Sequence, residues 1–230
     1  GDVEWDDVNT FVTLDFDLVA DIDAINATPD TFSLGIEVTG LSDPGALAAT
    51  VPGSIQSLMN SQVGTWRQRM GVIDQFTDGA VALWARIWTD KGGFSPEHHA
   101  TNFGDGGNFD WDQKNSGFEA GVDFAVSDEF SLGLLVGKSQ ADVDLDNPGV
   151  GSADLDGDTW GIYGTWISPT GFYLDASYRW MSFDVDLHST AGKMSFDDNA
   201  EVFNVELGYA WTLASGLKIE PQFQYTKTNL

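Results

Sequence analysis

The sequence predicts an all-β protein, an antiparallel up-and-down transmembrane β-barrel with one helix and an N-terminal β-rich segment. Apolar and polar residues alternate with a period of two from about residue 80 to the end of the chain. Short and long connections take turns between the expected strands. Each expected strand has about 10 to 17 residues, which is enough to cross a bilayer.

Composition excludes several classes of function. The chain has 230 residues, with 36 Asp and Glu against 10 Lys and Arg and a formal net charge of −26. Such a surface repels phosphates, so no nucleic-acid partner is expected. The absence of cysteine excludes disulfides and thiolate metal sites. No apolar stretch approaches the roughly 20 residues of a transmembrane helix, so any membrane role must use strands.

The first 40 residues are predicted to be β-rich. Residues 10–20 and 31–39 carry β-branched and aromatic residues in partial alternation, and residues 26–30 form a turn signal between them. Two strands are not stable alone in water. We therefore expect residues 1–40 to be the end of a larger β structure.

A linker and a helix are predicted within residues 41–78. Residues 41–53 are rich in Gly, Ala, Ser and Pro and are expected to be the linker. The helix is expected over residues 54–76, where apolar residues follow helical spacing and Ser54 would be the N-cap. Its surface carries arginines and amides, which are too polar for contact with lipid. We expect it to lie inside something polar.

Seven strands are predicted between residues 79 and 230. They cover about residues 80–89, 114–125, 129–143, 156–167, 171–187, 199–212 and 217–229. In the last three, one face is apolar and the other is polar. The apolar face includes the aromatic residues Phe172, Tyr178, Trp180, Tyr209 and Trp211, and the polar face includes Asp175, Arg179, Glu206 and Glu220.

A soluble β-sandwich alternates in the same way, because its apolar faces point at a second sheet. The connections favour the barrel. Tight turns are expected at residues 127–128, 168–171 and 214–216, and long polar connections at residues 90–113, 144–155 and 188–198. This order is typical of an outer-membrane barrel. An aromatic girdle is expected near the strand ends on the lipid face, formed by Trp160, Trp166, Trp180, Trp211 and Tyr178.

No metal, cofactor or catalytic site is predicted. The adjacent histidines of Glu97-His98-His99 point apart and lack a third ligand. The aspartates of residues 142–146 and 154–158 lack the spacing of a calcium-binding loop. The glycines of residues 104–107 precede no helix that would complete a phosphate site. We identify no Ser/His/Asp set from spacing.

Several hairpin sequences resemble the autotransporter β-domain of Gram-negative type V secretion. The resemblance spans about residues 54–230 and is carried by GFEAGVDFAV at residues 117–126, FSLGLLVGKS at 130–139 and DGDTWGIYGTW at 156–166. It implies a barrel of about twelve strands with a polar lumen, threaded by a helix that leads to a secreted passenger. Within this lumen it places Trp66, Arg67 and Arg69 of the helix and, on the strands, Asp123, Asp175, Arg179, Glu206 and Glu220.

Two departures from the family limit this comparison. Seven strands cannot close a barrel, because bacterial barrels use an even number and an unpaired edge in lipid is costly. The chain also stops at Leu230 without the terminal aromatic strand of the family, so about five further strands are expected beyond it. Gly64-Thr65 stands where some members carry a cleaved Asn-Asn pair, so self-cleavage by that route is not expected.

The predicted function is that of an outer-membrane translocator and anchor, which exports or displays an N-terminal passenger on a Gram-negative bacterium. Its expected partners are outer-membrane lipid and its own passenger, and the resemblance adds the barrel-assembly machinery and periplasmic chaperones. An acidic soluble β-sheet adhesin or calcium-stabilised module is an alternative, and a general porin is a weaker one. The inward carboxylates predict a cation-selective lumen.

Overall fold

The computed structural model describes residues 12–20, 32–41, 43–71, 76–95, 110–145, 151–189 and 192–230, the first two ranges by their backbone alone. Two strands, β1 (Val12–Ala20) and β2 (Phe32–Leu41), precede the helices α1 (Asp43–Val63) and α2 (Trp66–Met70). The later strands are β3 (Val81–Phe94), β4 (Trp111–Ala125), β5 (Phe130–Leu145), β6 (Gly151–Ile167), β7 (Phe172–Ser189), β8 (Gly192–Tyr209), β9 (Trp211–Thr212), β10 (Lys218–Ile219) and β11 (Gln222–Asn229). Neither described helix is both long enough and apolar enough to cross a membrane.

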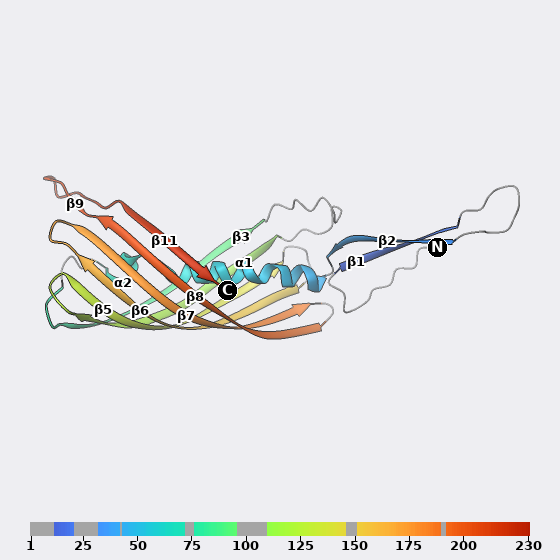
Figure 1. Cartoon of the computed structure of the whole chain (residues 1–230), viewed down its shortest axis with the longest axis horizontal. Helices are drawn as coiled ribbons and strands as arrows, with labels where there is room; N and C mark the ends of the chain where they lie inside the picture. Colours follow the sequence, from blue (N-terminus) through green and yellow to red (C-terminus); the bar gives the residue numbers. More distant parts are fainter. Residues whose placement is uncertain are drawn as a thin grey trace, which may run out of the picture.

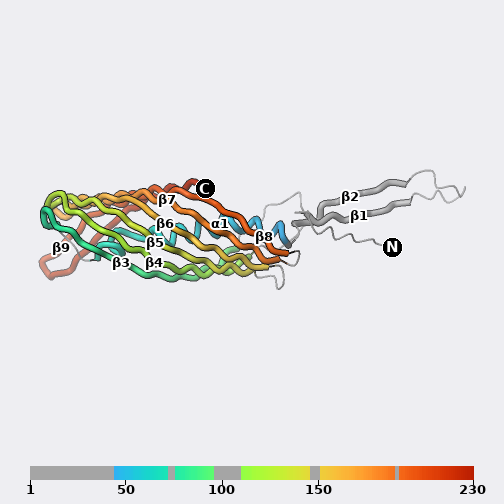
Figure 2. The backbone as a smooth tube through the Cα atoms, turned by 90° about the horizontal axis from the view of Figure 1, so that it is seen from below, coloured from blue at the N-terminus to red at the C-terminus, as the bar shows by residue number. Residues whose placement is uncertain are grey.

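Seven of the strands form one antiparallel sheet, in the order β11-β8-β7-β6-β5-β4-β3. The short pair β9-β10 joins β8 to β11. The sheet curves around α1, which contacts every strand from β3 to β7 (Figures 1 and 2). We call the face toward the helices the inner face and the opposite face the outer face. The predicted all-β, up-and-down antiparallel class is confirmed.

The strands run further than predicted at the end away from the tight turns. β5 continues to Leu145, β6 begins at Gly151 and β8 begins at Gly192. The predicted long connections at residues 144–155 and 188–198 are therefore wrong for most of their length. Asp144 and Asp154 are strand residues on the outer face, and they alternate with the buried inner residues Val143 and Leu155. Asp197 of β8 is exposed too, whereas Asp198 is half-buried on the inner face, opposite Phe183. Trp160 and Trp180 consequently lie in the middle of their strands, not near the ends as predicted.

Helix α1 begins eleven residues before the predicted start, so most of the predicted linker is helical. Pro52 lies inside α1 on its exposed side, and Ser54 is a fully buried helix residue instead of an N-cap. The sequence predicts a boundary at Pro52 because a proline removes one helical hydrogen bond, and this boundary is wrong. Burial of Leu47 and Val51 against the sheet outweighs that loss. The predicted helix also ends early, at Val63.

The last predicted strand is divided at Pro221. Proline has no N–H to donate to the ladder, and β10 and β11 are separate strands on either side of it. The carbonyl of Pro221 still accepts a hydrogen bond from the N–H of Tyr209 at 3.1 Å. The tight turns lie where they were expected, and Gly171 (φ +98°) and Gly216 (φ +82°) take the positive φ that the turns require.

The N-terminal strands pair with each other as a two-stranded sheet. In their backbone register Leu14 pairs with Val38 and Phe16 pairs with Ile36. The two strands confirm the β-rich prediction for this segment, whereas the turn expected at residues 26–30 lies outside the described residues. Only residue 42 separates β2 from α1.

Candidate functional site in the interior of the sheet

The helical segment on the inner face is interrupted at Gly64, between α1 and α2. This residue has φ +58°, a conformation that side chains with a Cβ rarely adopt. A Cβ at this position would lie 2.3 Å from Nη1 of Arg86 and 2.3 Å from Oε1 of Gln68. Oε1 of Gln68 accepts a hydrogen bond from the N–H of Thr65 at 2.9 Å, which starts α2. The positive φ therefore favours glycine here, and a Cβ would also displace the ends of the Arg86 and Gln68 side chains.

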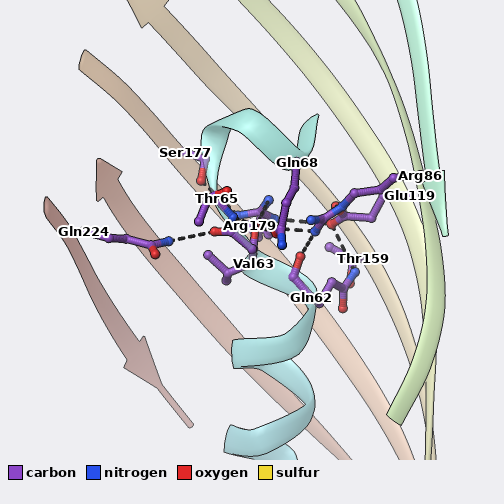
Figure 3. Close-up of polar contacts among 11 residues, drawn as sticks. Gln62, Val63, Thr65, Gln68, Arg86, Glu119, Thr159, Ser177, Arg179 and Gln224 are labelled. Carbon is purple, nitrogen blue, oxygen red and sulfur yellow. Dashed lines mark hydrogen bonds and ion pairs between the residues drawn. The ribbon is translucent and has the colours of Figure 1, made fainter. Parts of the chain in front are cut away.

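Three consecutive carbonyl groups at the end of α1 accept hydrogen bonds from side chains of three strands (Figure 3). The last carbonyls of a helix have no partner within it and form the negative end of its dipole, so cationic donors suit them. The pairs are Arg86 of β3 with the carbonyl of Gln62, Arg179 of β7 with that of Val63 at 3.4 Å, and Gln224 of β11 with that of Gly64 at 2.7 Å. The helix end is thus tied to both edge strands of the sheet.

Glu119 of β4 balances the two arginines of this group. It is fully buried, and its carboxylate accepts a hydrogen bond from Nε of Arg86 at 2.8 Å. Its other oxygen lies 3.4 Å from Nε of Arg179 and accepts from the side-chain amide of Gln62 at 3.3 Å. One buried carboxylate therefore compensates two buried guanidinium groups, which without it would lack a counter-charge.

A second ion pair fixes α2 on the inner face. Arg69 donates to Asp175 of β7 and to the hydroxyl of Thr165, the latter at 3.0 Å. The same hydroxyl donates to Asp175 at 2.6 Å. The guanidinium also lies 3.9 Å from the ring centroid of Tyr163, a cation–π contact. Both side chains are almost fully buried, so this ion pair is shielded from water.

The start of α2 is held by an aromatic stack and a carboxylate. Trp66 stacks on Tyr173 at 4.3 Å between ring centroids. Glu206 of β8 accepts the N–H of Trp66 at 2.7 Å and the hydroxyl of Tyr173 at 2.7 Å. Arg67 binds Glu220 through two hydrogen bonds of 2.9 and 2.7 Å, a bidentate pair at the rim of the interior.

The structure brings several of the predicted site residues together. Arg67 meets Glu220 and Arg69 meets Asp175, while Glu206 binds the backbone of Trp66. The remaining two charges lie in the buried inner rows, Asp123 on β4 and Arg179 on β7, and Arg179 pairs with Glu119.

The five predicted aromatics lie on the outer face or at its turn end. Phe172 and Trp211 are exposed, and Tyr178, Trp180 and Tyr209 are half-buried. They pack mainly on each other, with ring centroids 4.7 Å apart for Tyr178 and Trp180 and 5.0 Å apart for Tyr209 and Trp211. Trp180 also stacks on Trp160 at 4.0 Å.

Sequence reasoning missed Glu119, Arg86 and Gln224. A signal for Glu119 was available, because it lies four residues before Asp123 and so falls on the same face of one strand. Arg86 and Gln224 also lie within predicted strands. Their contacts join residues that are far apart in sequence, and those partners follow from the register of the sheet.

Within the part of the chain that the structure describes, no three His, Asp or Glu side chains are grouped as a metal site. The Glu97-His98-His99 segment and the glycines of residues 104–107 lie outside the described residues. The interior site consists of ion pairs and hydrogen bonds that hold α2 and the end of α1 against the sheet.

Replacing Gly64 with alanine is expected to cost about 2 kcal/mol or more in the free energy of unfolding, through the positive φ and the displacement of Arg86. Gly79 is the control, because its φ of +73° is similar and its Cβ would meet nothing within 4 Å. Denaturant titration of both variants of the full-length protein in lipid would isolate the steric part. Equal losses in the two variants would show that contact with Arg86 is unimportant.

Comparison with known proteins shows that this chain is similar to autotransporters. The sequence model of the autotransporter β-domain matches residues 95–230. The pertactin autotransporters of Bordetella parapertussis and Bordetella bronchiseptica are each 32% identical to this chain over 120 residues, which cover 49% of this chain and 13% of each relative. The chain thus matches only about an eighth of the length of these curated relatives.

A solved structure shows the same fold. The crystal structure of the β-domain of the Bordetella autotransporter BrkA aligns with a TM-score of 0.52 and 23% sequence identity. The alignment covers 65% of this chain and 58% of that structure. At this identity the likeness concerns the fold, an antiparallel barrel sheet of the autotransporter type.

Proposed function

Because the chain belongs to the autotransporter β-domain family, whose place is the outer membrane of Gram-negative bacteria, we propose that it exports an N-terminal passenger and then anchors it at the cell surface. The observation that carries this proposal is the seating of α2 and the end of α1 on a polar part of the inner face, with an apolar outer face on the same part of the strands. A helix with buried arginines needs such a polar interior, and exposed apolar side chains need lipid.

The inner charges are proposed to face the lumen. Trp66, Arg67 and Arg69 would be its helix residues, and Asp123, Asp175, Arg179, Glu206 and Glu220 its strand residues. Their burial against α2 supports this assignment, since charges with these partners are stable only away from hydrocarbon. Several carboxylates among them support the further proposal of a cation-selective lumen, which a planar-bilayer measurement showing no cation preference would overturn.

The outer aromatics Phe172, Tyr178, Trp180, Tyr209 and Trp211 are proposed to contact lipid. The outer face exposes many large apolar side chains, which would make a soluble adhesin prone to association. Family membership likewise favours the translocator over the soluble module. A porin would have no need for the helix and the strands before it.

The three segments of the chain are proposed to have different roles. Residues 1–40 would be the end of the passenger, residues 41–78 the connection and lumen helices, and residues 79–230 the barrel part. The barrel-assembly machinery and periplasmic chaperones are proposed partners in insertion. Any enzymatic activity would belong to the passenger.

An epitope tag placed before residue 43 of the full-length protein is expected to be reached by antibody on intact cells and removed by added protease. A second tag in the turn of residues 168–171 serves as the control, because the short turns lie on the periplasmic side and should be reached only after permeabilisation. Equal access to both tags on intact cells, or recovery of the protein in the soluble fraction, would contradict the proposal.

A further inference from the structure

On the outer face, each of the seven strands changes from apolar to polar side chains at one position. The last apolar or aromatic residues are Ile87, Phe118, Val136, Trp160, Trp180, Phe203 and Tyr225. We call this set the boundary line. The next outer residues, away from the tight turns, are Thr89, Ser116, Lys138, Asp158, Ser182, Glu201 and Lys227. The outer residues after those, Lys91, Lys114, Gln140, Asp156, Asp184, Asn199 and Asn229, are polar as well.

The boundary line does not follow the hydrogen-bonding register. Ile87 lies opposite Phe118, but Val136 lies opposite Ala120, two residues along β4. Two further shifts of two residues occur between β7 and β8 and between β8 and β11, all in the same direction. Over the sheet the line moves about one residue per strand, which at about 3.4 Å per residue and 4.8 Å between strands describes a tilt of about 35°. This tilt is the one that barrel strands have in a bilayer, so the line marks a flat plane across tilted strands.

The width of the apolar band agrees with a bilayer. On β7 it extends from Phe172 at the turn to Trp180 at the boundary line. At that tilt these residues span about 22 Å along the membrane normal, close to the apolar band of about 25 Å that outer-membrane barrels show. The strand then continues to Ser189, about 25 Å further along the same normal.

The inner face changes in the opposite sense near the same line. On β7, Asp175 and Arg179 face inward on the turn side of the line, and Phe183 and Val185 face inward beyond it. The residues beyond the line belong to one buried apolar cluster with α1. From the helix it contains Ala46, Leu47, Val51, Ile55, Leu58, Met59 and Val63, and from the strands Ala141, Val143, Leu145, Ala153, Leu155, Met181, Phe183, Val185 and Leu187, among others.

We propose that the sheet leaves the bilayer at the boundary line, and that the half of the sheet beyond it stands in water as a cup that seats α1 through an apolar core. This proposal rests on the proposed outer-membrane function. Polar residues outside and apolar residues inside are the pattern of a soluble protein, and the reverse pattern on the same strands is that of a membrane barrel. Exposed aspartates such as Asp156 and Asp184 could not contact hydrocarbon at low cost.

The cup and the charged site have different roles in this proposal. The charged site contacts α2 and the last residues of α1, and it sets where the helix stops. The cup buries the preceding turns of α1, where Leu47, Ile55 and Leu58 are almost fully inaccessible. The hydrophobic effect operates there as in any soluble core, so apolar contact outside the membrane is what retains the helix.

Thiol labelling tests the position of the line, because the chain contains no cysteine. Asp184→Cys and Ala176→Cys place single thiols on the outer face of one strand, beyond and below the line. With a membrane-impermeant maleimide on intact cells, Asp184→Cys of the full-length protein is expected to react at least about tenfold faster than Ala176→Cys. Equal rates, with both variants folded in the outer membrane, would overturn the proposal.

A third single-cysteine variant tests whether the apolar core of the cup holds α1. Ile55→Cys lies in the core and is expected to be protected from the maleimide in the otherwise unchanged protein. Adding Leu155→Ala and Phe183→Ala removes apolar contacts of the cup and should raise its labelling by about tenfold or more, whereas adding Asp175→Asn should not. Protection that is lost only with Asp175→Asn would overturn the assignment of the seat. Failure of the proposed function would look different, since the protein would then be missing from the outer-membrane fraction.

Discussion

Replacing Glu119 with glutamine is expected to lower the free energy of unfolding of the full-length barrel by about 3–5 kcal/mol, the cost of leaving a buried charge unpaired. Glu119 is the shared counter-charge of Arg86 and Arg179, whose side chains are only 10% and 3% exposed. Glutamine keeps the shape of the side chain and removes its charge. Two largely buried guanidinium groups would then remain in the interior without this carboxylate. Denaturant titration in lipid vesicles measures the loss.

A double variant provides the control for this prediction. Glu119→Gln with Arg179→Met removes one positive charge together with the negative one, so it should recover part of the lost stability. A loss below about 1 kcal/mol in Glu119→Gln, or no recovery in the double variant, would contradict the described pairing.

The strands could be predicted from the sequence because the alternation of apolar and polar residues does not depend on how the strands pair. Phe172, Leu174 and Tyr178 mark one face of β7 and Asp175 and Arg179 the other, whatever the neighbouring strands do. The extensions of the strands were missed because the pattern inverts beyond the boundary line. A run of exposed aspartates looks like a polar loop until their apolar neighbours are known to face inward.

The helix was predicted by its apolar spacing, but its limits were not. Pro52 suggested a start that tertiary burial overrides, and Gly64 gave no signal of a break because an isolated glycine is common inside a helix. At the break, Arg86 of a distant strand lies beside Gly64 and donates to the carbonyl of Gln62. Such a contact arises from the assembled sheet.

Pairings inside the site depend on register, which period-two patterns leave open. Arg86 and Glu119 are direct partners across β3 and β4. A slip of one residue would send one of them to the outer face. Predicted strand ends were uncertain by several residues, so the faces of the charged residues could be predicted and most of their partners could not.

Two acidic residues show how the helix completes the sheet. Asp175 and Glu206 are neighbours across β7 and β8, an arrangement that is unfavourable for like charges. Arg69 forms an ion pair with Asp175. Glu206 accepts hydrogen bonds from the N–H of Trp66 and the hydroxyl of Tyr173. The inner face is therefore complementary to the seated helix, and it would carry adjacent uncompensated carboxylates before the helix arrives.

Replacing Leu134 with arginine is expected to destabilise the full-length barrel in lipid by about 1–2 kcal/mol, between the cost of a cation on the lipid face at the bilayer midplane and its cost at the interface. Leu134 is an exposed outer residue of β5, one outer position below Val136 of the boundary line. Its distance from that line sets how far the new guanidinium must reach for the interface. Denaturant titration in vesicles of fixed lipid composition measures the change.

Gln140→Arg is the matched control, because Gln140 lies on the same strand and face but beyond the boundary line. There the cation meets water and nearby carboxylates, including Asp156, which accepts a hydrogen bond from Gln140 at 2.9 Å in the native protein. The expected cost is about 0–1 kcal/mol. If both variants lose the same free energy, residues 134 and 140 share one environment and the outer face has no lipid boundary between them. A larger loss at residue 134 than at residue 140 follows from the apolar band ending where the aspartates begin.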